Sequence, residues 1–186
     1  MKLKKILALA LSGILAVSML AGCGGAAGSV TNDNVKPATS AVIGSVNKQL
    51  DELQVKFASD SDFASQLAIV ANSATLSDVS NLSGGDYLTG NAQAALTYVT
   101  GAKWMQSAPD AAGTYVCGIW FDGGMSGDAV ATAVANNLNL AASITDGFNV
   151  TKSALESYKV TVGTGASEKT VWLVGILVTL ETKSTT

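Results

Sequence analysis

The sequence predicts an α+β domain, built as a three-layer α-β-α sandwich around a small, largely antiparallel sheet, with helices mainly in the N-terminal half. Apolar residues recur at helical spacing in the first half of the chain, and apolar and polar residues alternate, as in strands, in the second. Residues 170–181 are apolar on both faces, so a layer must cover each face of that strand. Because the other apolar stripes are helical, this layout is preferred to a two-layer domain with helices on one face and a partner or ligand on the other.

Two helices are expected shortly after Pro37. The first spans about residues 40–57, because its apolar residues recur at three- and four-residue intervals. These residues are Val42, Ile43, Val46, Leu50, Leu53 and Phe57. The second helix is expected to start with Asp60 or Ser61 as its cap, since a side-chain oxygen there accepts a hydrogen bond from the first turn. Its inward residues are Phe63, Leu67 and Val70 or Ala71.

Two further helices are expected on either side of the first strand. One spans about Asn91 to Met105 and ends before Pro109. Its inward residues are Ala92, Leu96 and Val99. The other is capped by Ser126, and Asp128 lies favourably at the positive end of its dipole. Its inward residues are Val130, Val134 and Leu138.

Three strands are expected in the second half. Residues 114–121 are rich in β-branched and aromatic side chains and are followed by the turn Asp122-Gly123-Gly124. After a turn capped by Thr151, residues 158–162 alternate between apolar and polar positions. We expect this second strand to form an antiparallel hairpin with residues 170–181, and the first strand to flank residues 170–181 on the other side.

The first 22 residues have the organisation of a secretory leader. Lys2, Lys4 and Lys5 precede an uncharged apolar run over residues 6–20. This run is shorter than the ~20 residues that cross a ~30 Å hydrocarbon core, so a permanent transmembrane helix is disfavoured. It ends in Leu20-Ala21-Gly22-Cys23, which resembles the lipobox of bacterial lipoproteins. An ordinary signal peptide with a chance cysteine is the alternative.

The resemblance implies that the Cys23 thiol receives a diacylglyceryl group, that cleavage occurs before Cys23, and that the new amine is often acylated. Several acyl chains, each buried with ~0.8 kcal/mol per CH₂, give durable anchoring to a membrane. Residues 23–36 hold mostly small and polar side chains, which predicts a lipidated flexible tether leading to a single domain over residues 37–186. The expected location is therefore the extracytoplasmic face of the cell membrane.

The composition excludes several chemistries. Fourteen acidic residues against eight lysines, after Lys2, Lys4 and Lys5 leave with the leader, give residues 23–186 a net charge of 8 − 14 = −6, which disfavours a nucleic-acid partner. The chain has no His, so Ser-His-Asp and Cys-His catalysis and His-ligated zinc are excluded. Once Cys23 is lipidated, Cys117 is the only thiol, and no internal disulfide can form. No cofactor or resident metal is expected.

The foremost candidate ligand loop comprises Asp122, Gly123, Gly124, Ser126 and Asp128. Its glycines allow backbone N–H groups to converge on an anion at a helix start, whereas its two carboxylates favour a cation such as calcium. Ser126 with Asp128 also explains a plain capped turn, and this interpretation is preferred.

Aromatic and thiol side chains give weaker candidates. Trp104 is the tryptophan expected to be exposed, and with other aromatics it would present a stacking face to a sugar or peptide. Trp120 and Trp172 are expected in the core. Cys117 is expected to be a small buried side chain, because neither His nor Arg is present to lower its pKa.

The C-terminal part resembles a second family. The order of its elements, with Val160-Thr161-Val162-Gly163 and Val171-Trp172-Leu173-Val174, is similar to the CAP superfamily of cysteine-rich secretory and pathogenesis-related proteins. The resemblance covers about seventy residues and implies an α-β-α layout. The family's cleft histidines and Gly-Glu-Asn segment are absent, and Trp104-Met105-Gln106-Ser107 precedes the first strand instead of following it, so no functional residue is carried over.

Two classes of function remain. The anchor, the tether and the lack of catalytic constellations favour a noncatalytic module of the cell envelope that binds a protein, peptide or glycan. The alternative is an envelope hydrolase that uses carboxylates such as Asp86, Asp110, Asp122 or Asp128. No carboxylate pair has a sequence context that singles it out, so the binding module is preferred.

Overall fold

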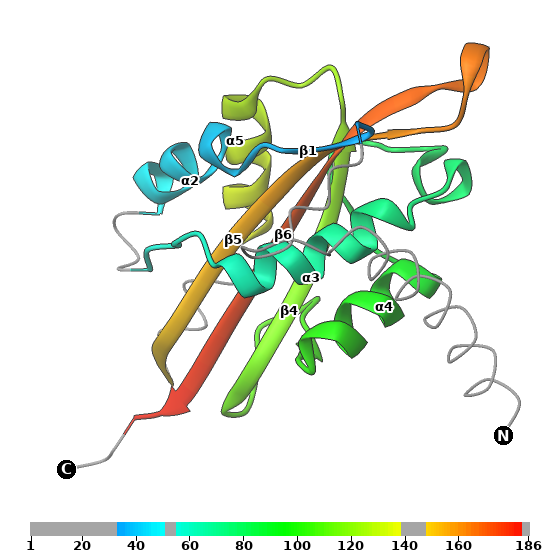
Figure 1. Cartoon of the computed structure of the whole chain (residues 1–186). Coiled ribbons are helices and arrows are strands. Elements are labelled where there is room, and N and C mark those ends of the chain that lie inside the picture. Colours follow the sequence, from blue (N-terminus) through cyan, green and yellow to red (C-terminus); the bar gives the residue numbers. More distant parts are fainter. Residues whose placement is uncertain (1–32, 51–54, 139–147, 184–186) are drawn as a thin grey trace, which may run out of the picture.

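The computed structural model describes residues 33–50, 55–138 and 148–183. In this part of the chain, helices and a six-stranded sheet form a mixed fold (Figure 1). All but one of the strand pairings are antiparallel, which confirms the predicted α+β class. Among the described residues, no helix has both the length and the apolar character needed to span a membrane.

The sheet has the strand order β1-β5-β6-β4-β2, and β3 pairs with β4 in parallel. The strands are β1 (Val35–Pro37), β2 (Asp86–Tyr87), β3 (Lys103–Trp104), β4 (Gly113–Asp122), β5 (Phe148–Val162) and β6 (Lys169–Thr182). β5 and β6 form an antiparallel hairpin, and β4 pairs with the other edge of β6. Both parts of the predicted strand arrangement are confirmed, because a strand that is apolar on both faces belongs in the middle of a sheet.

The helices are α2 (Ile43–Gln49), α3 (Ser61–Asn72), α4 (Gly90–Thr100) and α5 (Gly127–Asn137). Short 3₁₀ turns occur at η1 (Thr39–Ala41), η3 (Leu76–Val79) and η4 (Gly165–Ser167). The Asp60 carboxylate accepts a hydrogen bond of 2.8 Å from the Phe63 amide and caps α3. Ser126 caps α5 through the Ala129 amide. Both predicted caps are confirmed, so local side-chain chemistry sets where these helices begin.

The first expected helix, over residues 40–57, is too long. In the structure α2 ends at Gln49, and residues 55–60 are not helical. The Ala58 amide donates to Ser153 O, and the Leu155 amide donates to Ala58 O, so this segment pairs with β5. Phe57 is nevertheless buried, which explains why it matched the helical pattern, whereas Leu53 lies outside the described residues.

Two other expected boundaries are also wrong. The helix expected to reach Met105 ends at Thr100, because Gly101 adopts a left-handed conformation with φ of 64°. Thr151 does not cap a turn but lies within β5, which begins at Phe148. At the other end of the domain, β1 begins at Val35, two residues before the start that the composition predicted.

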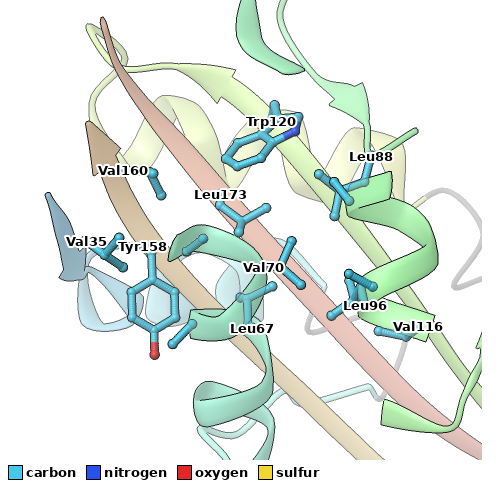
Figure 2. Close-up of a cluster of buried hydrophobic side chains, with 14 of the residues drawn as sticks. Val35, Leu67, Val70, Leu88, Leu96, Val116, Trp120, Tyr158, Val160 and Leu173 are labelled. Atoms are coloured by element: carbon cyan, nitrogen blue, oxygen red, sulfur yellow. The ribbon is translucent and has the colours of Figure 1, made fainter. Parts of the chain in front are cut away.

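Alternate side chains of β6 enter two separate apolar clusters. The first, called the α3/α4 core, contains Leu173 and Leu177 together with Phe63, Leu67 and Leu96 from the helices. Figure 2 shows side chains of this core from both helices and from the strands beneath them. The second cluster, called the α2/α5 core, is built around Trp172, Val174, Ile176, Val46 and Val130. Both faces of the central strand are therefore buried.

Two glycines lie side by side at the centre of the sheet. Gly118 of β4 is paired with Gly175 of β6. A Cβ at Gly175 would lie 2.8 Å from the Leu67 methyl carbons, and one at Gly118 would lie 2.5 Å from a methyl carbon of Leu88. The missing side chains thus let α3 and the residues next to α4 approach the sheet closely.

Candidate functional site

The candidate ligand loop is held by hydrogen bonds within the protein. Asp122 lies at the end of β4, and its carboxylate accepts a hydrogen bond of 2.8 Å from the Gly124 amide. The Asp128 carboxylate accepts a hydrogen bond of 2.6 Å from the Ser45 hydroxyl of α2. Since Ser126 caps α5, each polar side chain predicted for this loop has a structural partner.

The same loop is packed closely against its neighbours. A Cβ at Gly123 would overlap the carbonyl oxygen of Thr170, and one at Gly127 would overlap that of Ala41. The Trp172 indole donates a hydrogen bond of 3.1 Å to Met125 O. The loop therefore joins β4, β6 and the start of α2, and the interpretation as a capped turn fits this geometry better than an ion site.

Three of the four carboxylates considered for hydrolysis, those of Asp86, Asp122 and Asp128, accept hydrogen bonds from nearby protein groups. Asp86 accepts hydrogen bonds from the amide and hydroxyl of Ser83, at 2.7 and 3.1 Å. Asp110 is exposed on the connection between β3 and β4. Among the described residues, no group of three or more His, Cys, Asp or Glu side chains is arranged to hold a metal ion.

Trp104 is partly buried and not the exposed aromatic that the sequence predicted. It packs against both cores and meets Tyr87 edge to face, with 6.5 Å between the ring centroids. Burial raises the pKa of the Tyr87 hydroxyl. Tyr98 on α4 is instead 66% exposed. Trp120 and Trp172 are buried, as expected.

Cys117 is a fully buried residue of β4 in the α2/α5 core. Burial raises the pKa of its thiol to about 12, so a nucleophilic thiolate does not form near neutral pH. This agrees with the predicted role as a small core residue.

The thiol of Cys117 should therefore resist alkylation while the domain is folded. In a Cys23→Ser variant, where Cys117 is the only thiol, iodoacetamide at pH 8 should give no mass shift in buffer and complete modification in urea. Mass spectrometry measures both states. Rapid modification of the folded variant would show that β4 opens locally or that the thiol is not buried.

A buried carboxylate that the sequence analysis missed lies on β5. Glu156 is only 3% exposed, and its two oxygens accept three hydrogen bonds. The donors are the Ser59 hydroxyl at 2.7 Å, the Asp60 amide at 2.6 Å and the Thr39 hydroxyl at 2.7 Å. Glu156 thus joins η1 and the start of α3 to the same strand.

Neighbouring polar groups complete this cluster. The Ser157 amide donates to the Thr39 hydroxyl at 2.9 Å, and the Ala38 amide donates to Ser157 O at 2.8 Å. A hydrogen bond from Lys152 and one from the Phe63 amide hold the pKa of Asp60 below its usual value. The Ser157 hydroxyl is buried without a partner among the described atoms. The cluster closes the outer edge of β5 between β1 and Ala58.

The burial of Glu156 could have been inferred from its position. It alternates with Ala154, Tyr158 and Val160, all buried in the α3/α4 core. Extending the strand prediction four residues towards the N-terminus would have placed Glu156 on the apolar face. A carboxylate at such a position requires hydrogen-bond donors.

Comparisons with known proteins give no relative from which a role could be transferred. No protein-family model matches the chain, and no curated protein or solved structure is significantly similar to it. Cys23, the expected lipid-attachment residue, lies outside the described residues.

Proposed function

We propose that the chain is the precursor of a bacterial lipoprotein, whose domain is a noncatalytic binding module held by Cys23 on the extracytoplasmic face of the cell membrane. The observation that carries the proposal is the segment Leu20-Ala21-Gly22-Cys23 directly after a basic and then apolar leader. Its partner class is a protein, peptide or glycan of the envelope.

The hydrogen bonds of the acidic side chains support the noncatalytic part of the proposal. Asp86, Asp122, Asp128 and Glu156 accept hydrogen bonds from nearby protein groups. A general acid and base must instead face a common substrate position. These carboxylates stabilise turns and edges of the fold, which favours binding over hydrolysis.

We also propose that the domain is a three-layer α-β-α sandwich. The two apolar clusters support this layout, because alternate side chains of β6 contribute to each. Residues of α3 and α4 belong to one cluster, and residues of α2 and α5 belong to the other. In Figure 1, α3 crosses the near side of the strands, and α4 lies beside β4.

Replacement of the lipid-bearing cysteine tests the anchor. The variant Cys23→Ser should move the protein from the membrane fraction to the periplasm or medium, because no acyl chain then holds it. Fractionation with immunoblotting measures this, and mass spectrometry of the wild-type mature terminus should detect the lipid. Cys117→Ala is the matched control, since it removes the other cysteine and should leave the protein in the membrane. Unchanged membrane retention of Cys23→Ser would refute the proposed anchor.

A further inference from the structure

Two lysines face each other across the outermost strand pair of the sheet. Lys36 of β1 is directly paired with Lys159 of β5, so their side chains lie on the same face. Lys36 is exposed and Lys159 is partly exposed. The Lys159 ammonium lies 4.6 Å from the centre of the Trp172 ring, which holds its charge at the margin of the α2/α5 core.

The two lysine charges repel each other in the isolated domain. Like charges directly opposite each other on antiparallel strands repel. Neither lysine forms a salt bridge with another described residue. The next pair on the same face is Thr161 and Thr170, whose hydroxyl oxygens are 3.2 Å apart. We call Lys36, Lys159, Thr161 and Thr170 the lysine strip.

The lysine strip contains no carboxylate, although residues 23–186 carry a net charge of 8 − 14 = −6. The acidic residues near it in the sequence are Asp33 before β1, Glu156 on the opposite face of β5, and Glu168 in the β5–β6 turn, and the loop that carries Asp122 packs against Thr170. A third lysine near this end of the sheet, Lys169 at the start of β6, donates hydrogen bonds to the carbonyl oxygens of Val79 and Ser80. The strip thus presents two lysines that no salt bridge neutralises among the described residues of an acidic protein.

The described chain begins at the same end of the sheet as the lysine strip. The Thr161 amide donates a hydrogen bond of 2.7 Å to Asn34 O, so the chain enters the domain beside the β5–β6 turn. Figure 1 shows this turn at the end of the sheet opposite the C-terminus. The ten residues from Cys23 to Asp33 can span at most about 35 Å. β6 alone is about 43 Å long, so the far end of the sheet lies farther from the chain's entry into the domain than this segment can extend.

We propose that the lysine strip is a docking surface for anionic lipid headgroups and orients the anchored domain with its β5–β6 turn towards the bilayer. The inference rests on the proposed lipid anchor, which holds the strip within reach of the surface. Anionic headgroups attract the two ammonium groups and relieve their mutual repulsion, while the acidic remainder of the domain is repelled. The far end, with Phe148 and Thr182 paired across β5 and β6, then points away from the membrane.

The orientation can be measured in vesicles carrying the full lipidated protein. A fluorophore is attached to a cysteine introduced as Thr164→Cys in the β5–β6 turn or as Glu181→Cys near the end of β6; both positions are exposed. Cys117 is buried and should not be labelled. In vesicles of phosphatidylcholine with phosphatidylglycerol, headgroup-attached quenchers should quench the label at 164 and spare the label at 181. This difference should shrink in pure phosphatidylcholine, which has no net charge. It should also shrink at 1 M salt, where the Debye length falls to about 3 Å and the attraction between charges is screened.

Replacing both lysines of the strip should abolish the difference in quenching between the labels at positions 164 and 181. Two surface lysines favour association with anionic lipid by roughly thirty-fold, and Lys36→Gln with Lys159→Gln should remove that factor. Lys103→Gln is the matched control, because Lys103 is an exposed lysine near the start of β4, away from the β5–β6 turn. The separate variant Lys36→Glu should raise Tm by roughly 1–3 °C, because it replaces the repulsion with an opposite-charge pair, and should also lose the oriented state.

Each outcome separates this inference from the proposed function. Protein that floats with the vesicles but is quenched equally at both labels would overturn the lysine-strip proposal and leave the anchor intact. The lysine-strip proposal is also overturned if the double variant only aggregates more, as expected for lysines that merely protect a sheet edge, and keeps the quenching pattern. Protein that does not float because Cys23 carries no lipid would overturn both proposals.

Discussion

Replacement of Glu156 by Ala is expected to lower the free energy of unfolding by about 3 kcal/mol. The carboxylate accepts hydrogen bonds from Thr39, Ser59 and the Asp60 amide in a site that is 3% exposed. Removing it leaves three donors without their acceptor, and each unsatisfied buried group costs about 1 kcal/mol or more. Urea unfolding followed by circular dichroism measures the loss.

Glu156→Gln is the matched control for this prediction. Its amide oxygen can still accept from Ser59 and Asp60, and its NH₂ group can donate to the Thr39 hydroxyl, so the loss should be no more than about 1 kcal/mol. A hydroxyl can reverse its role in this way, whereas a backbone amide cannot. Equal stability of the Ala and Gln variants would show that the three donors do not depend on an acceptor at position 156.

Gly175→Ala is expected to destabilise the domain by about 1–3 kcal/mol through overpacking. The added Cβ would lie 2.8 Å from the Leu67 methyl carbons and 2.9 Å from Phe63 Cζ. Both side chains are buried in the α3/α4 core, so α3 must shift away from the sheet to make room. Thermal unfolding should detect the change as a lower Tm.

The same substitution at Gly44 should have the opposite sign. Gly44 lies on α2, and its added Cβ would meet no atom within 4 Å. Gly44→Ala should therefore stabilise the domain by about 0.5–1 kcal/mol through helix propensity. A double-mutant cycle of Gly175→Ala with Leu67→Ala should give a favourable coupling, because the smaller side chain removes the overlap. A Gly175→Ala variant as stable as wild type would contradict the close approach of α3.

The central features of the fold could be predicted because a strand that is buried on both faces has a distinct pattern of apolar residues in the sequence. Residues 170–181 are apolar at successive positions, which identified the central strand and hence its two neighbours. The caps at Asp60 and Ser126 were found because capping depends on one side chain and its local backbone. These signals survive in a single sequence without knowledge of the tertiary contacts.

Other elements depend on contacts between residues that are distant in the sequence. The first half of β5 has a register shift between Val150 and Lys152 and then buries the polar residues Glu156 and Ser157, so it lacks the alternation of a strand. β1, β2 and β3 are too short to show a period. The turn at Asp122 could be predicted in kind, but its packing against Thr170 and Ala41 could not, because those residues are distant in sequence.

The pairing of β1 with β5 has a consequence for how the chain is made. Val35 of β1 pairs with Val160 of β5, 160 − 35 = 125 residues later, so the first strand has no partner until almost the whole protein has been synthesised. At ~5–20 residues per second, this interval lasts on the order of ten seconds. Throughout that time the edge of the sheet cannot close, because β5 and β6, which complete the domain, have not yet been synthesised.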